Sequence, residues 1–312
     1  MIADLSRMPH VSAFDSWETK AWVRTGSDPE PAGTGAEFFP EELVPHLGHP
    51  AVRAAPDQLR RYLAAQHLYQ WLRFTVHFEI AVVNRATQKI ADGTSGLLLP
   101  ADSRMTAYQI YVDEGFHSLE SLRVLEQVER DSRIPALPYE FGRFLEQLDA
   151  IGQDRPEQLG LVRLLQVCVF ETLVTSILSD IPRDGRVLPV VRELVDDHAA
   201  DERRHHAYFA TLFRSLWTQL GEGERQLVAE LLPDVIVRSL QPATTPAYDA
   251  LRAAGFGPAA AEDVVRESYS REAVTAGIRF AARKTIRLFE ECGALDPPGA
   301  RDRYLDAGLL TG

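Results

Sequence analysis

Apolar residues at helical spacing run through most of the chain. Residues 57–91 contain no Gly or Pro, and their apolar positions recur about every 3.6 residues, which is typical of a long helix. The same spacing predicts further helices at about residues 103–132, 139–150, 156–179, 189–220, 223–240, 245–254 and 258–293. The alternation of apolar and polar residues that marks strands is not evident. The sequence therefore predicts an all-α protein.

The first part of the chain has a different pattern. Residues 1–55 carry the densest Gly and Pro punctuation, which interrupts regular structure. We interpret residues 1–55 as an irregular N-terminal arm packed on the body, and residues 56–312 as a single helical domain. The arm offers Phe38, Phe39 and Leu43 as apolar anchors.

Two glutamates interrupt strongly apolar helical runs. Glu79 lies within residues 74–83 and Glu171 within residues 167–174, each with large apolar neighbours on both sides. One such glutamate could tilt to a wet edge, since glutamates usually remain exposed. Two in matching places indicate a buried site. Burying a bare carboxylate costs several kcal/mol, so such groups need protonation or a bound cation.

Each of these glutamates is followed by a Glu-x-x-His motif. Glu114 and His117 form the first, and Glu202 and His205 form the second, with His198 one helical turn before Glu202. Residues three and four apart share one face of a helix, so the side chains of each motif point the same way. A single motif of this kind arises often by chance, whereas the order Glu, ExxH, Glu, ExxH is specific.

This order matches the ferritin-like bundles that bind two iron or manganese ions, with one Glu from each of two helices and an ExxH from each of two others. Two divalent cations would cancel four buried carboxylates. Carboxylate and imidazole ligands without thiolate favour iron or manganese over structural zinc. Asp113 and Asp201 precede the motif glutamates, and we expect each to accept a hydrogen bond from an imidazole and fix its orientation.

The composition limits the partners. A net charge of −12 argues against nucleic acid and anionic membranes, which recruit excess Lys and Arg. Two cysteines suggest no disulfide framework, and no apolar stretch is long enough to span a bilayer. We expect a soluble, cytoplasmic protein.

The chain resembles the AurF-like p-aminobenzoate N-oxygenase family, whose di-iron site has four Glu and a third His one turn before the second ExxH. The resemblance is carried by seven residues, here called the seven candidate ligands: Glu79, Glu114, His117, Glu171, His198, Glu202 and His205. It implies a ferritin-like helical bundle with additional C-terminal helices, a homodimer, and two iron ions, with manganese as the alternative. It also implies O₂ as co-substrate, a peroxo-di-iron oxidant, an external electron donor such as a reductase, and oxidation of an arylamine to hydroxylamine, nitroso or nitro products.

A substrate pocket is expected beside the metals. We assign its wall to Thr75, Val83, Cys168 and Thr175, and we expect Arg279 on a late helix to hold a substrate carboxylate. Three alternatives remain open at this point. The same metals could hydroxylate or desaturate carbon, the protein could be a ferroxidase or iron-binding protein, or the chain could be a metal-free helical scaffold.

Overall fold

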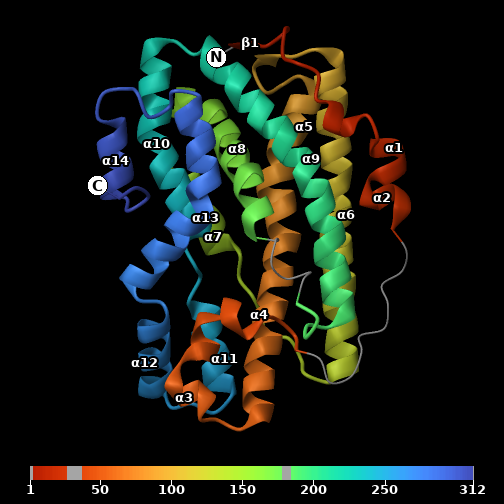
Figure 1. Cartoon of the computed structure of the whole chain (residues 1–312), viewed down its shortest axis with the longest axis vertical. Coiled ribbons are helices and arrows are strands. Elements are labelled where there is room, and N and C mark those ends of the chain that lie inside the picture. The colour runs from red at the N-terminus through yellow and green to blue at the C-terminus, as the bar shows by residue number, and fades with distance from the viewer. Residues whose placement is uncertain (1–2, 27–36, 178–183, 312) are drawn as a thin grey trace.

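Four long, roughly parallel or antiparallel helical segments form the body of the protein (Figure 1). The computed structural model describes residues 3–26, 37–177 and 184–311, with the side chains of residues 175–177 outside the description. The four segments are α4 (Asp57–Phe78), α6 (Ala101–Ser132), α8 (Leu159–Ile177) and α9 (Pro189–Gln219). The prediction of an all-α protein is confirmed, and the predicted bounds of α6, α8 and α9 differ from the observed ones by only a few residues.

The first long helix contains a local irregularity that the sequence did not reveal. After α4 the chain forms a π-helical turn at Glu79–Asn84 and then continues as α5 (Arg85–Asp92). Gly93 ends the helix with a left-handed backbone at φ 80°, a conformation that glycine adopts without strain. Single π turns within helices often occur at functional sites, and this one begins at the buried Glu79.

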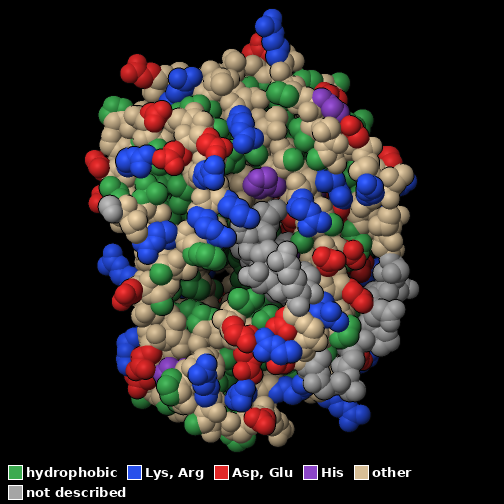
Figure 2. All heavy atoms as spheres, in the orientation of Figure 1, with side chains coloured by type: hydrophobic (Ala, Val, Ile, Leu, Met, Phe, Trp, Pro, Cys, Tyr) green, Lys and Arg blue, Asp and Glu red, His purple; other side chains and the backbone are tan. Residues whose placement is uncertain are grey.

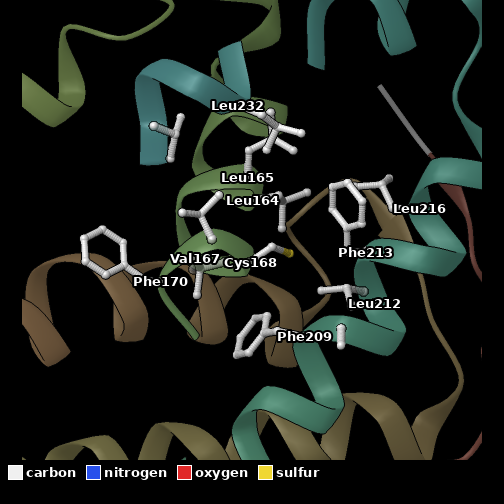
Figure 3. Close-up of a cluster of buried hydrophobic side chains, with 14 of the residues drawn as sticks. Leu164, Leu165, Val167, Cys168, Phe170, Phe209, Leu212, Phe213, Leu216 and Leu232 are labelled. Carbon is white, nitrogen blue, oxygen red and sulfur yellow. The ribbon is translucent and has the colours of Figure 1, made fainter. Parts of the chain in front are cut away.

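The core lies where α8 packs against α9 and α10 (Glu222–Leu240). Figure 3 shows Leu164, Leu165 and Cys168 of α8 facing Phe209 and Phe213 of α9. These side chains are buried, and their helical spacing places them on the faces that meet. This packing holds α8 and α9 side by side.

The C-terminal helices form a further layer on the bundle (Figure 1). They are α11 (Thr245–Ala253), α12 (Pro258–Ser268), α13 (Arg271–Glu291) and α14 (Ala300–Asp306). The single helix predicted over residues 258–293 is wrong, because the chain breaks between α12 and α13. Ser270 has an extended backbone there, and its hydroxyl accepts a hydrogen bond from the Ala273 amide, which starts a new helix.

The N-terminal segment is more regular than expected. Its short elements are β1 (Ala3–Asp4), α1 (Trp17–Lys20), α2 (Trp22–Thr25) and α3 (Pro50–Arg53), joined by 3₁₀ turns. β1 pairs in parallel with β2 (Leu97–Leu98), which precedes α6. The remaining helix, α7 (Gly142–Asp149), lies within the stretch predicted at residues 139–150.

Charges of both signs are interspersed over the face seen in Figure 2, which also has a hollow with hydrophobic side chains on its wall. Among the described residues, no helix has the length and apolar character needed to cross a membrane.

Candidate metal centre

The π turn at Glu79–Asn84 and the helices α6, α8 and α9 bring all seven candidate ligands into one buried cluster. They arrange into two groups of potential donors, and within each group the donor atoms lie within 4.8 Å of one another. Glu202 belongs to both groups. The first group is Glu79, His117, His198 and Glu202, and the second is Glu114, Glu171, Glu202 and His205. Each residue is at most 5% exposed.

The first group is centred on His198. Its Nε2 atom lies 3.1 Å from Oε1 of Glu202 and 3.4 Å from Oε1 of Glu79. The His198 ring also lies 4.1 Å, centroid to centroid, from the ring of His117. The extra histidine, one helical turn before the second motif, therefore points into the cluster and away from solvent.

The second group is centred on His205. Its Nδ1 atom lies 2.8 Å from Oε1 of Glu114, 3.5 Å from Oε1 of Glu202 and 3.8 Å from Oε2 of Glu171. His117 likewise directs Nδ1 inward, at 3.3 Å from Glu114 and 3.7 Å from Glu202. The two motif histidines thus present Nδ1 to the cluster, whereas His198 presents Nε2.

The two aspartates lie behind the motif histidines, and each contacts the histidine of the other helix. Asp113 of α6 lies 3.2 Å from Nε2 of His205 on α9, and Asp201 of α9 lies 3.2 Å from Nε2 of His117 on α6. Each aspartate therefore serves the histidine of the other motif. A carboxylate that accepts the outer N–H holds the imidazole in the tautomer that leaves Nδ1 free to bind a cation.

The N-terminal segment supplies donors to these aspartates, which sequence reasoning missed. The indole Nε1–H of Trp17 donates to both oxygens of Asp113, at 3.0 and 2.9 Å. The backbone N–H of Trp22 donates to Asp201, at 3.2 Å to each oxygen. The five-residue spacing of the two tryptophans was the available signal, but nothing in it indicates which distant carboxylates they reach.

Two further contacts close the outer side of the cluster. Phe14 stacks on His205 with ring centroids 6.2 Å apart, and Trp22 stacks on His117 at 5.9 Å. Arg204 also pairs with Asp201. The first residues of the chain therefore form a lid of aromatic side chains over both motif histidines.

The cluster has the electrostatics of a cation site. Burial raises the pKa of Glu171 well above its ordinary value, and the neighbouring carboxylates of Glu202 and Glu114 raise it further. One oxygen atom of Glu171 and one of Glu202 are buried without a hydrogen-bonding partner. Buried polar atoms are almost always paired in native proteins. Two divalent cations would supply partners for these atoms and cancel the four carboxylates, so the residues present fit such a pair.

A cavity of about 80 Å³ opens directly on the cluster. Glu79, Glu171, His198 and Glu202 form its polar end. The rest of its wall is largely apolar and aromatic, and consists of Trp71, Phe74, Thr75, Phe78, Val83, Phe170, Leu173, Val174, Ser239 and Leu240. Among these described wall residues there is no Lys or Arg.

The structure places the predicted pocket residues in different environments. Thr75 and Val83 line the cavity. Cys168 does not line it, because it lies one turn before Glu171 and packs into the α8–α9 core (Figure 3). The described residues of α8 in the cavity wall are Phe170, Glu171, Leu173 and Val174. Arg279, which lies on α13, is also absent from the described wall. The side chain of Thr175 lies outside the described residues.

Comparison with known proteins gives two findings. The family model described as P-aminobenzoate N-oxygenase AurF matches residues 14–293. The chain is also similar to a 4-aminobenzoate N-oxygenase of Streptomyces thioluteus, with 24% identity over 268 residues that cover 83% of this chain and 78% of that protein. The matched range includes the four cluster-bearing helical segments and begins at Phe14, within the aromatic lid.

Proposed function

Because this chain belongs to the p-aminobenzoate N-oxygenase AurF family and is an oxygenase, we propose that it uses O₂ at a two-metal centre to oxidise the amino nitrogen of an arylamine. The observation that supports this most directly is the pair of buried donor groups sharing Glu202 beside an apolar cavity. The two donor groups suit two cations, and the largely apolar cavity beside them would let a substrate approach while excluding water.

The seven candidate ligands have assigned places in this proposal. Glu79, His117 and His198 would hold one cation, Glu114, Glu171 and His205 would hold the other, and Glu202, which belongs to both groups, would be available to each. The donors are carboxylates and imidazoles without thiolate, which suits iron or manganese. Ferrous ions held there would supply electrons for the reduction of O₂, and an external reductant would return those electrons to the metals.

The cavity determines how the substrate approaches. Its aromatic wall, with Phe78 and Phe170 at 4.0 Å between ring centroids, favours a flat apolar molecule and excludes water. Glu79 and His198 lie at its polar end, so the amino group of the substrate would point toward them. The uncharged amine is the form that such a cavity favours, because burying an unpaired ammonium is costly.

The experiment is aerobic incubation of the protein, loaded with ferrous iron, with 4-aminobenzoate and with uncharged arylamines, followed by mass spectrometry. We expect oxygen to be added at nitrogen, and iron analysis to give two ions per chain. A product oxygenated on a ring carbon would instead favour the hydroxylase alternative. Oxidation of excess Fe(II) with every amine left unchanged would favour the ferroxidase alternative.

A matched pair of variants links the chemistry to the centre. Glu171→Gln keeps the shape of the side chain but removes a ligand charge at the cavity end, whereas Arg279→Gln alters a residue on α13 outside the cavity wall. We expect the first to abolish product formation and the second to retain it. Equal activity in both variants would contradict the assignment of Glu171.

A further inference from the structure

A second cavity lies on the N-terminal side of the metal centre, where the first residues of the chain cover α9. Its volume is about 560 Å³, and it shares no wall residue with the cavity that opens on the metal cluster. We call it the basic pocket. Its polar wall comes from α9 and from the segment around α1 and α2, and consists of Ser16, Thr19, Lys20, Thr25, Arg203 and Arg204. Among the described residues of its wall there is no Asp or Glu.

Three cationic side chains converge on the basic pocket of a protein that is acidic as a whole. The chain has 45 Asp and Glu against 33 Lys and Arg. Lys20 and Arg203 are exposed, and within the described part of the chain neither side chain forms a hydrogen bond or an ion pair. Glu18, the acidic residue of α1, lies 3.3 Å from Arg24 instead. Like charges held close together repel one another, so a bound anion would stabilise this arrangement.

Arg204 connects the basic pocket to the metal centre. Its side chain is only 11% exposed and pairs with Asp201, which in turn lies 3.2 Å from Nε2 of His117. A guanidinium group carries five N–H donors, so Arg204 can contact Asp201 and a ligand in the pocket at the same time. Only two side chains, Arg204 and Asp201, therefore separate such a ligand from a candidate metal ligand.

The two lid tryptophans hold the wall of the basic pocket in place. The indole of Trp17 and the backbone N–H of Trp22 donate to the two buried aspartates of the metal centre. α2 packs against α6 and α9, and Figure 1 shows α1 and α2 together at this side of the bundle. Ser16 precedes α1 and Lys20 is its last residue, so both belong to an anchored element. A wall fixed in this way loses little conformational freedom when a ligand binds.

We propose that the basic pocket binds the phosphate group of a small-molecule ligand. Guanidinium groups bind phosphate through paired N–H donors, and a Lys ammonium adds a compact charge. A phosphate ester carries a charge of about −1.5 to −2 at pH 7, which the side chains of Lys20 and Arg203 together would balance. The hydroxyl of Ser16 donates no hydrogen bond within the described chain, so it is available to a phosphate oxygen.

The volume of the basic pocket fits a ligand larger than phosphate alone. Sites for small molecules commonly enclose about 300–1,000 Å³. Ala13, Ala200 and the methyl groups of Thr19 and Thr25 offer apolar surface to the rest of such a molecule. Its identity as an electron carrier would rest on the proposed function, which needs an external reductant close to the metals but outside the substrate cavity. Flavin mononucleotide, a phosphate ester that carries electrons, therefore serves as the larger probe.

The test is calorimetric titration of the full, metal-loaded chain with pyrophosphate, at an ionic strength held constant with sodium chloride. We expect the wild type to bind, and Lys20→Gln combined with Arg203→Gln to weaken binding at least about tenfold, because two charged donors are lost. Arg279→Gln combined with Lys284→Gln is the matched control, since it removes the same two charges from α13. Circular dichroism verifies folding. No binding by the wild type, or an equal effect of the two double variants, would overturn the proposal. Pyrophosphate bound only at the metals would remain bound in the pocket variant, and that result would overturn it as well.

Flavin mononucleotide and riboflavin distinguish a phosphate ester from a free phosphate-type anion. The two flavins differ only in the phosphate group, and each is titrated by its fluorescence with pyrophosphate as competitor. Flavin mononucleotide that binds at least about tenfold more tightly than riboflavin, and is displaced by pyrophosphate, would support an ester ligand. Binding of pyrophosphate without flavin mononucleotide would support a free anion in the same pocket. None of these measurements requires amine oxidation, so a failure to bind phosphate and a failure of the proposed function are distinguishable.

Discussion

Removing the indole N–H of Trp17 should weaken metal binding without unfolding the protein. In Trp17→Phe the ring remains aromatic, but Asp113 loses the donor that now reaches both of its oxygens. Asp113 is fully buried and also accepts from Nε2 of His205. A hydrogen bond to a charged group contributes about 1.5–3 kcal/mol, which corresponds to about a 10–100-fold change in an equilibrium constant. We expect an effect in that range.

Trp22→Phe is the matched control. Trp17 and Trp22 are 8% and 7% exposed, so the two substitutions remove similar buried area. Trp22, however, reaches Asp201 through its backbone N–H, which the substitution keeps. The assay strips the metals with a chelator, titrates Co(II) or Fe(II) anaerobically against a competing chelator, and follows unfolding in parallel. Equal loss of affinity in both variants, or wild-type affinity in Trp17→Phe, would refute the positioning role of the indole.

Three further predictions concern other parts of the molecule. Glu202→Gln should reduce the metal content of both positions, whereas Glu79→Gln should reduce only one, and metal analysis of the purified proteins measures the difference. Burial lowers the pKa of His46 to about 4, so its neutral form stabilises the fold and this contribution is lost as pH falls from about 6.5 toward 4. Between pH 7 and pH 4.5 the free energy of unfolding, measured in urea, should therefore fall by about 2–3 kcal/mol less in His46→Gln than in the wild type. An equal fall in both proteins would contradict this. Phe170→Leu should enlarge the cavity and raise kcat/KM for bulkier arylamines about tenfold relative to small ones, as competition assays can show.

Helices and motifs that repeat along the chain could be predicted from the sequence. Features that depend on contacts between distant residues could not. Helical spacing over residues 57–91 and the two Glu-x-x-His motifs were sufficient to predict the main helices and to select seven residues that the structure brings together. The π turn was not predictable, because nothing in the composition of residues 79–84 differs from an ordinary helix. The break between α12 and α13 was also not predicted from the sequence. The helical spacing of apolar residues continues through it, but Ser270 caps a new helix there.

The pocket residues illustrate the same limit. Cys168 and Glu171 are three residues apart and share a helix face, so spacing alone places both beside the cluster. The structure separates them along the axis of α8, since aromatic side chains of α9 fill the space around Cys168 while the cavity begins at Phe170. Spacing determines which face a residue lies on, but the side chains of neighbouring helices determine whether that part of the face is filled or open.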